Sequence, residues 1–257
     1  MSGFSILLRK ELAESWETRR LPVVAGLFVV VGMISPLTAR YLPEILRAAL
    51  GDQLPVALPV PTAVDAVAQL QKNLAQIGAL VAIALAMGSV SGELDRGTAA
   101  LVLAQPVTRP AFLAAKLTAI GLVLLVATLL AAVVAWIYTA VLFAPPSIGG
   151  WLVMAVLSWL ALTAWAALTF LASAATGSTM AAAGIGFVAL IGVSLAAIVP
   201  ALDRLLPTGL TKPAILLATG EASGVDGGRL LTAVVGTLVI IGACLAGAVL
   251  AFRRREL

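Results

Sequence analysis

Long apolar segments recur along this chain at the length that a helix needs to cross a membrane. About 20 apolar residues in a helix span a hydrocarbon core roughly 30 Å thick. Short segments of alternating polarity, which are typical of a membrane β-barrel, are absent. The pattern therefore predicts an all-α membrane protein in which residues 1–257 form a single domain. The six expected transmembrane helices are 21–39, 74–92, 117–143, 151–172, 180–199 and 230–252.

The N-terminal segment 1–20 carries a different pattern, which indicates a helix with one apolar face. Leu8, Leu12 and Trp16 recur every four residues, and Lys10 lies off this stripe at the spacing of an i,i+4 ion pair with the glutamate that follows it by one turn. A helix of this kind lies in the plane of the lipid headgroups. We therefore expect an amphipathic helix at the cytoplasmic surface, which either anchors the chain or docks a partner.

Composition supports the membrane assignment and narrows the partners. Hydrophobic residues make up 61% of the chain and charged residues 11%, whereas soluble domains average roughly 45–50% and about 25%. The net charge of +4 does not indicate nucleic-acid binding, because the basic residues flank apolar segments instead of forming a patch with interleaved aromatic residues. We therefore expect a lipid bilayer around the chain and no nucleic-acid partner. Cys244 is the single cysteine, so an intrachain disulfide is excluded.

The distribution of lysine and arginine predicts the orientation. With a cytoplasmic N-terminus, ten of these 16 residues fall in inside segments and six in outside segments, which agrees with the excess of positive charge found on the cytoplasmic side. The chain is therefore expected to be a multi-pass protein of the plasma (inner) membrane with both termini in the cytoplasm. In this topology, residues 173–184 begin polar but uncharged and predict a tight cytoplasmic turn.

Two longer segments, 40–73 and 200–229, fall on the outside. The prolines of the first exclude one continuous helix, and Pro36 is expected near the end of the first span. Within the second, residues 214–218 are apolar but too few to cross a membrane, which favours a partly buried re-entrant or interfacial segment. Neither shows a cluster of metal ligands, and three acids of the second are expected to be ordinary solvated charges: Asp203, Glu221 and Asp226.

The sequence lacks the residues by which this chain could supply its own energy for transport or carry out catalysis. Every acid and base lies outside the core of a span and histidine is absent, whereas pumps and secondary transporters usually carry an ionisable relay inside the membrane. All four lysines follow a residue other than glycine, so the phosphate-binding motif of an ATPase is also missing. The serines of the spans have no histidine base for intramembrane catalysis. We therefore expect no ATP-hydrolysing, catalytic or metal site on this chain and an energy source on another one.

The connector between the second and third spans, GELDRGTAALVLAQPVTRPAFLAAK (92–116), is unusually charged for so apolar a chain. A simple connector needs only a few uncharged residues, so a longer charged element indicates that something docks there. Its charges are Glu93, Asp95, Arg96, Arg109 and Lys116, and the last of these is expected to extend to the lipid headgroups.

The same connector contains signals for a short transverse helix. Gly92 and Gly97 allow the chain to turn sharply. Residues 98–104 can form two helical turns before Pro106 ends them. Thr108 is then placed to cap the next helix. The segment is therefore predicted to be a semi-rigid cytoplasmic element between two breaks.

This connector resembles the first cytoplasmic loop of ATP-binding-cassette permeases of the second type. The segment LLRKELAES (7–15) is similar to the amphipathic elbow helix of that family, and the ending FRRREL to its basic tail. In the loop, the resemblance rests on Glu93, Gly97, Thr98, Leu103, Pro106, Arg109 and Lys116.

The resemblance implies a permease subunit, most often of an exporter, that forms the translocation pathway with a second copy or a homologous permease. Two ATPase subunits would bind ATP and Mg²⁺, and this chain would carry no cofactor. Residues 98–104 would be the coupling helix within the cytoplasmic coupling loop 93–112. The loop would contact the ATPase through Glu93, Arg96, Gly97, Thr98, Leu101, Leu103, Pro106 and Arg109, and the elbow helix through Leu8, Lys10, Glu11, Leu12 and Trp16.

Two other functions stay open at this point. A non-transporting scaffold or assembly subunit would bind the ATPase without moving a solute. A secondary transporter would depend on a sodium or proton gradient and need no ATPase. The transported substrate, the direction of transport and the residues that contact the substrate do not follow from the sequence.

Overall fold

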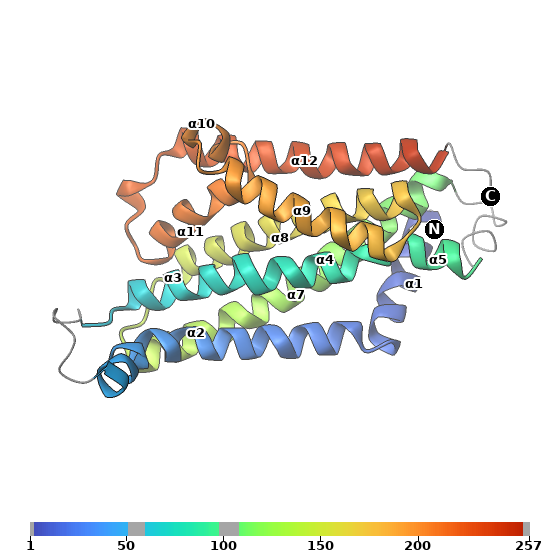
Figure 1. The fold of residues 1–257 in the computed structure, drawn as a ribbon. Helices are drawn as coiled ribbons and strands as arrows, with labels where there is room; N and C mark the ends of the chain where they lie inside the picture. Colours follow the sequence, from blue (N-terminus) through green and yellow to red (C-terminus); the bar gives the residue numbers. More distant parts are fainter. Residues whose placement is uncertain (1–2, 51–59, 98–107, 254–257) are drawn as a thin grey trace.

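The computed structural model describes residues 3–50, 60–97 and 108–253, and within these residues every regular element is a helix. Six helices are long and apolar enough to cross a membrane, which confirms the predicted fold class. They pack side by side as one bundle (Figure 1). The helices are α2 (Arg20–Leu50), a second span made of α3 (Ala63–Asn73), the π-helix η2 (Leu74–Gly78) and α4 (Ala79–Met87), then α7 (Arg109–Leu142), α8 (Ile148–Thr176), α9 (Thr179–Ala196) and α12 (Gly227–Arg253).

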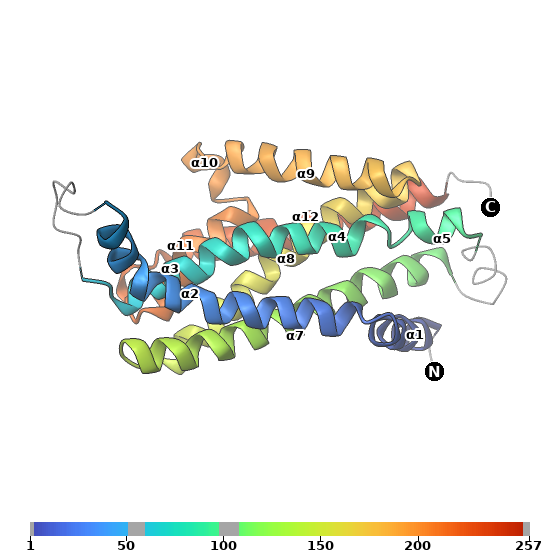
Figure 2. The ribbon, with the colours of Figure 1, turned by 60° about the horizontal axis from the view of Figure 1, so that its bottom comes forward.

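The predicted N-terminal helix is present as α1 (Gly3–Glu17), which runs across one end of the bundle (Figures 1 and 2). Leu7 is its most deeply buried residue, at 7% exposed, and the helix packs against α7. The chain turns from α1 into α2 at Arg19, which has the left-handed backbone angle φ of 60°. The last residues of α12 lie at the same end of the bundle, which is called the termini end below.

The first two spans are longer than predicted, and residues 40–73 are not simply a loop. α2 continues past the expected end at residue 39 to Leu50, with Pro36 and Pro43 inside the helix. Its last turns bend away from the rest of its axis (Figures 1 and 2), as expected where a proline removes a backbone N–H. α3 begins at residue 63, where the N–H of Thr62 donates to the carboxylate of Asp65 (2.8 Å), the reciprocal half of a capping box.

α8 lies at the centre of the bundle, whereas α9 lies at its surface. α8 packs against α4, α7, α9, α11 and α12, and side chains such as Phe170 are fully buried. The turn between α8 and α9 consists of Gly177, in the left-handed conformation (φ 68°), and Ser178, which caps α9. The tight turn predicted for residues 173–184 is therefore confirmed but much shorter, because a left-handed glycine ends a helix within one residue.

The segment before α12 is folded onto the bundle. α11 (Thr211–Ala218) packs against α8 with Ala214 and Ala218 buried, which confirms a partly buried segment there. Asp203 is not an ordinary solvated charge as predicted, because its carboxylate accepts a hydrogen bond from Arg229 (2.7 Å). This ion pair fastens α10 (Pro200–Asp203) to the first turn of α12.

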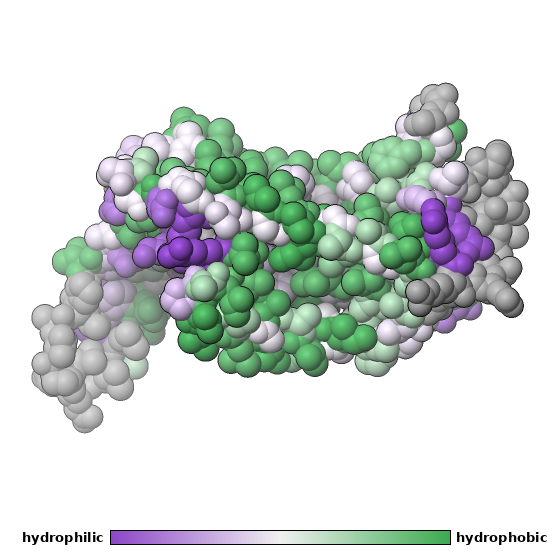
Figure 3. Space-filling view, turned by 90° about the horizontal axis from the view of Figure 1, so that it is seen from above, coloured by the Kyte–Doolittle hydropathy of each residue, from purple (hydrophilic) through white to green (hydrophobic). Residues whose placement is uncertain are grey.

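The surface carries the pattern of a membrane protein. In the view of Figure 3, hydrophobic residues cover the middle of the bundle and hydrophilic residues gather near its two ends. Large apolar side chains on α9 are strongly exposed, among them Val188 (69%) and Leu195 (61%). Lipid or another apolar surface is needed to cover them.

Candidate functional site

Lys116, in the second turn of α7, is the centre of an ion-pair cluster at the termini end. Only 4% of its side chain is exposed, and its ammonium donates to Glu11 Oε1 of α1 (2.9 Å) and Glu93 Oε1 of α5 (Ser91–Asp95) (2.6 Å). The expectation that this lysine extends to the lipid headgroups is therefore wrong. Two carboxylates within reach give the ammonium better partners than the interface does.

Lys10 joins the same cluster from the exposed side. Its ammonium lies 2.9 Å from Glu14, 3.1 Å from Glu11 and 3.5 Å from Glu93, so the predicted ion pair with Glu14 is confirmed. Burial disfavours the charged ammonium, but the hydrogen bond to Glu14 and the charges of Glu11 and Glu93 raise the pKa of Lys10. Burial likewise opposes ionisation of Glu14, but the hydrogen bond from Lys10 and the positive charges of Lys10, Lys116 and Arg20 lower its pKa.

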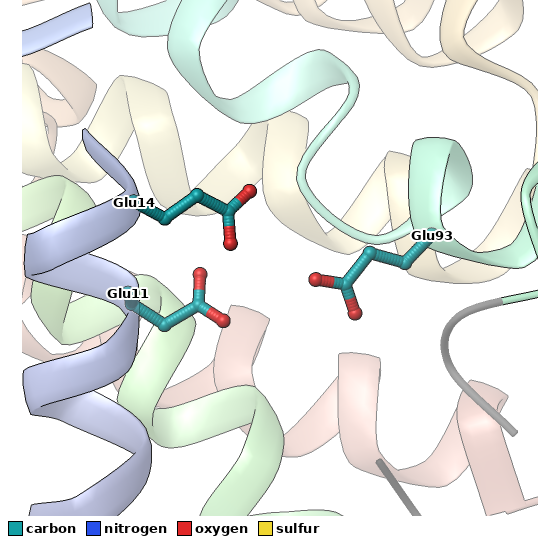
Figure 4. Close-up of side chains that lie close together, drawn as sticks. All are labelled: Glu11, Glu14 and Glu93. Atoms are coloured by element: carbon teal, nitrogen blue, oxygen red, sulfur yellow. The ribbon is translucent and has the colours of Figure 1, made fainter. Parts of the chain in front are cut away.

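The three glutamates point toward one another (Figure 4), with carboxylate oxygens within 4.8 Å of each other. Such a set of oxygens resembles a metal site by geometry alone. Two ammonium groups already lie among the three carboxylates, however, and compensate most of their charge. The arrangement is therefore that of an ion-pair network, and its physical effect is to tie α1 and α5 to α7.

A second set of contacts holds α5 against the turn between α8 and α9. The backbone N–H of Ser91 donates to Ser173 Oγ (3.1 Å), and Ser91 Oγ lies 2.8 Å from Thr179 Oγ1. Gly97, after α5, has the left-handed angle (φ 68°) expected for a sharp turn. Gly92 does not form a turn as predicted, because it lies inside α5, and the chain breaks in the turn before that helix.

Arg109 ties the start of α7 to the end of α12. Its guanidinium donates to the carbonyl oxygens of Phe252 and Arg253, both at 3.3 Å, and lies 5.9 Å from the centre of the Phe252 ring. Thr108 caps α7 as predicted, since its hydroxyl accepts from the N–H of Ala111 (3.4 Å). At the termini end, α7 is therefore held by two sets of contacts. One set joins it to α1 and α5, and the other joins it to α12.

Comparison with known proteins places the chain in a family. A family model described as ABC-2 family transporter protein matches residues 5–257, nearly the whole chain. The chain belongs to the ABC-2 family. It is also similar to an uncharacterized transmembrane protein, YxlG, of Bacillus subtilis (strain 168), with 29% identity over 118 residues. That alignment covers 45% of this chain and 46% of YxlG, so the chain spans less than half the length of the relative it matches.

The structure of this ABC-2 chain places only part of the predicted loop interface. Glu93 lies inward, with 14% of its side chain exposed, and its carboxylate pairs with Lys116. Arg96 is exposed beyond the last turn of α5. The coupling helix 98–104 falls outside the described residues, together with Thr98, Leu101, Leu103 and Pro106.

All five residues of the predicted elbow interface lie in the part of the chain that the structure describes, and they fall into two groups. Lys10 and Glu11 belong to the ion-pair cluster. Leu8 and Leu12 are half-buried, and Trp16 is 65% exposed. The apolar stripe therefore faces α7 at its start and the surroundings of the protein at Trp16.

Sequence reasoning missed the partnership of Lys116 with α1. The signal available was a single lysine between two apolar stretches, FLAA and LTAI, with no acid within four residues on its own helix. A lysine at this position must either reach the lipid headgroups or pair with an acidic residue from another element. The neighbouring elements supplied two glutamates, one of which lies 105 positions away in sequence.

A polar cluster also lies inside the opposite half of the ABC-2 bundle. Gln71, 4% exposed, donates to Ser158 Oγ of α8 (2.9 Å), and Asn73 donates to Ser35 Oγ of α2 (2.8 Å). A cavity of about 80 Å³ borders this cluster, next to the π-helix η2 and Trp165. These groups satisfy one another across three spans and hold them in register within an apolar interior.

Proposed function

We propose that this chain is the membrane-spanning subunit of an ATP-driven exporter of the ABC-2 family. In this proposal it forms the translocation pathway with a second copy or a homologous permease and is driven by two separate ATPase subunits that hold ATP and Mg²⁺. The family match over residues 5–257 supports the permease role. The sequence has no glycine-lysine phosphate-binding motif, which supports an ATPase on another chain.

The observation that carries the coupling part of the proposal is the double ion pair of Lys116. The helix α5 leads directly into the coupling loop, and α1 precedes the first span. Because Lys116 joins both of these elements to the first turns of α7, a displacement of either is transmitted to a helix of 34 residues. Packed side chains and ion pairs of this kind are the physical means by which coupling is transmitted between sites.

Docking itself is assigned to apolar contacts. Exposed ion pairs are worth about 0.2–1 kcal/mol each, whereas buried apolar anchors dominate most interfaces. In the proposal, Leu101 and Leu103 are these anchors and Arg96 is a rim charge. In the proposal, Trp16, which is exposed on α1, is a further apolar contact with the ATPase. The termini end is assigned to the cytoplasm, where ATP is available.

The test is co-purification of the ATP-binding-cassette ATPase that accompanies the tagged wild-type chain from its native membrane. Replacing Leu101 and Leu103 together with aspartate is expected to abolish co-purification. The matched control replaces Leu202 and Leu205 with aspartate. These are two exposed leucines at the other end of the bundle, and this variant is expected to retain the ATPase. If the variant with aspartate at positions 101 and 103 still co-purifies with the ATPase, the docking surface is placed wrongly.

Transport is tested separately in vesicles that contain the chain with and without its ATPase. Export that needs ATP and the ATPase supports the proposal. Solute movement by the chain alone would overturn it in favour of a secondary transporter. An ATPase that binds and hydrolyses ATP without moving any cellular solute would favour a scaffold.

A further inference from the structure

A groove of about 530 Å³ opens on the side of the bundle at the termini end, between α2 and α4. Its walls are apolar along most of their length, including Val23 and Leu27 of α2 and Val81 and Leu85 of α4. The groove ends at the junction of α1 and α2, where two consecutive arginines, at positions 19 and 20, line it. It therefore has a long apolar part and a strongly basic end.

The packing of the spans explains why the groove exists. α2 packs against α3 toward the opposite end of the bundle and along α7, whereas α4 packs mainly against α8 and α9. The two walls therefore separate as they approach the termini end (Figures 1 and 2). Val23 is 66% exposed and Leu27 40% exposed, so apolar side chains of the first span are left uncovered along the groove.

The basic end is held in place by the backbone. Arg19 has a φ of 60°, a left-handed backbone conformation that is strained for a residue with a side chain. Within residues 3–50, 60–97 and 108–253, the salt bridges involve neither Arg19 nor Arg20. Glu14 is close enough for Arg20 to contribute to the lowering of its pKa, yet both guanidinium groups stay exposed.

We propose that this groove binds one anionic phospholipid from the leaflet on the termini side. The phosphate lies against Arg19 and Arg20, and an acyl chain lies between α2 and α4. Basic pockets beside membrane helices suit anionic headgroups, because guanidinium groups pair bidentately with phosphate. A helix of a second copy or of another apolar partner would cover the walls but leave two arginines without a counter-charge, so a lipid fits better.

The lipid would also bear on the orientation of α1. Its headgroup would sit at the only residues that separate α1 from α2, Thr18 and Arg19. A bound phosphate there would neutralise the arginines and fix the angle at which α1 leaves the first span. This inference does not depend on an ATPase or on transport, and its test uses the permease chain alone.

The test measures lipid retention by native mass spectrometry. The full-length chain is purified from detergent containing equal amounts of dioleoylphosphatidylglycerol and dioleoylphosphatidylcholine. The wild type is expected to keep one phosphatidylglycerol per chain. Each arginine near an anionic headgroup favours binding about fivefold, so replacing both with glutamine, R19Q/R20Q, should reduce retention on the order of 30-fold. The lysine variant R19K/R20K should retain most of it.

Two further variants separate a defined site from diffuse attraction. R9Q/R253Q removes two exposed arginines at the same end but outside the groove, and it should retain the lipid. Ala84→Trp fills the groove at an exposed position of α4 without changing charge, and it should release the lipid.

Three results of the retention measurements would overturn the proposal, and one competition result would do the same. The three are equal retention of the two phospholipids by the wild type, equal losses in R19Q/R20Q and R9Q/R253Q, and full retention in the Ala84→Trp variant. Displacement of the bound species by 10 mM inorganic phosphate would likewise show an ion site instead of a lipid site.

Discussion

Removing the charge of Lys116 is the most direct test of the ion-pair cluster. Lys116→Met keeps a side chain of similar length and its contact with the Phe112 ring, which lies 5.1 Å from the ammonium. The change leaves Glu11 and Glu93, with 13% and 14% of their side chains exposed, without their buried partner. Breaking a fully buried ion pair costs about 3–5 kcal/mol.

The free-energy cost expected for Lys116→Met is smaller than this, because a second lysine lies near the same glutamates. Lys10 remains 3.1 Å from Glu11 and 3.5 Å from Glu93, although 43% of its side chain is exposed. One ammonium therefore stays near the two carboxylates, although it is also paired with Glu14 (2.9 Å), and we expect a loss of about 2–3 kcal/mol. For a chain of this size, 1 kcal/mol corresponds to about 2–4 °C in Tm, so the melting point should fall by roughly 4–12 °C.

The assay is a thermal melt of the purified chain in detergent, followed by size-exclusion chromatography of the protein that stays soluble. Lys72→Met changes an exposed lysine of α3 and is the matched control, with an expected change within about 0.5 kcal/mol. The triple variant K116M/E11Q/E93Q should be less destabilised than K116M, because it leaves no uncompensated charge. A melting point of K116M within 1 °C of wild type, or a triple variant less stable than K116M, would refute the reasoning.

Two further predictions concern other parts of the termini end. Gly177→Ala should destabilise the chain by about 1–2 kcal/mol, because φ is 68° there, whereas Gly184→Ala, with open space around the added carbon, should cause no loss in the same melt. Glu14→Gln should cost about 0.5 kcal/mol at pH 7, since the side chains of Glu14 and Lys10 are 34% and 43% exposed. The folded-state pKa of Glu14 is lowered, so this stabilisation is present above the ordinary carboxyl pKa and lost as the pH falls through the folded value. The difference in melting point between the variant and the wild type should therefore shrink as the pH falls below the ordinary carboxyl pKa, and a difference that stays constant with falling pH would contradict this assignment.

The spans and the amphipathic helix followed from the sequence because lipid imposes a simple rule. Each crossing must satisfy its own backbone hydrogen bonds and expose apolar side chains, so length and hydropathy suffice to find it. The ends were harder to predict. α2 runs past Pro36 and Pro43, since one missing N–H does not end a helix whose other turns stay bonded and packed.

The ion-pair cluster was accessible only in part. The pair between Lys10 and Glu14 is local, and the i,i+4 spacing predicted it. The contacts of Lys116 with Glu11 and Glu93 join three elements, and no periodicity encodes which helices meet. Asp203 and Arg229 show the same limit, because the turn that brings them together depends on how α11 packs against α8.

The exposed indole of Trp16 can serve as an intrinsic fluorescence probe. Trp151 and Trp165 are 3% and 5% exposed, whereas Trp16 is 65% exposed at the end of α1. A water-soluble quencher such as iodide should therefore reduce emission from Trp16 far more than emission from the interior tryptophans. Protection of that emission would report, in unlabelled protein, the moment at which another molecule covers the elbow.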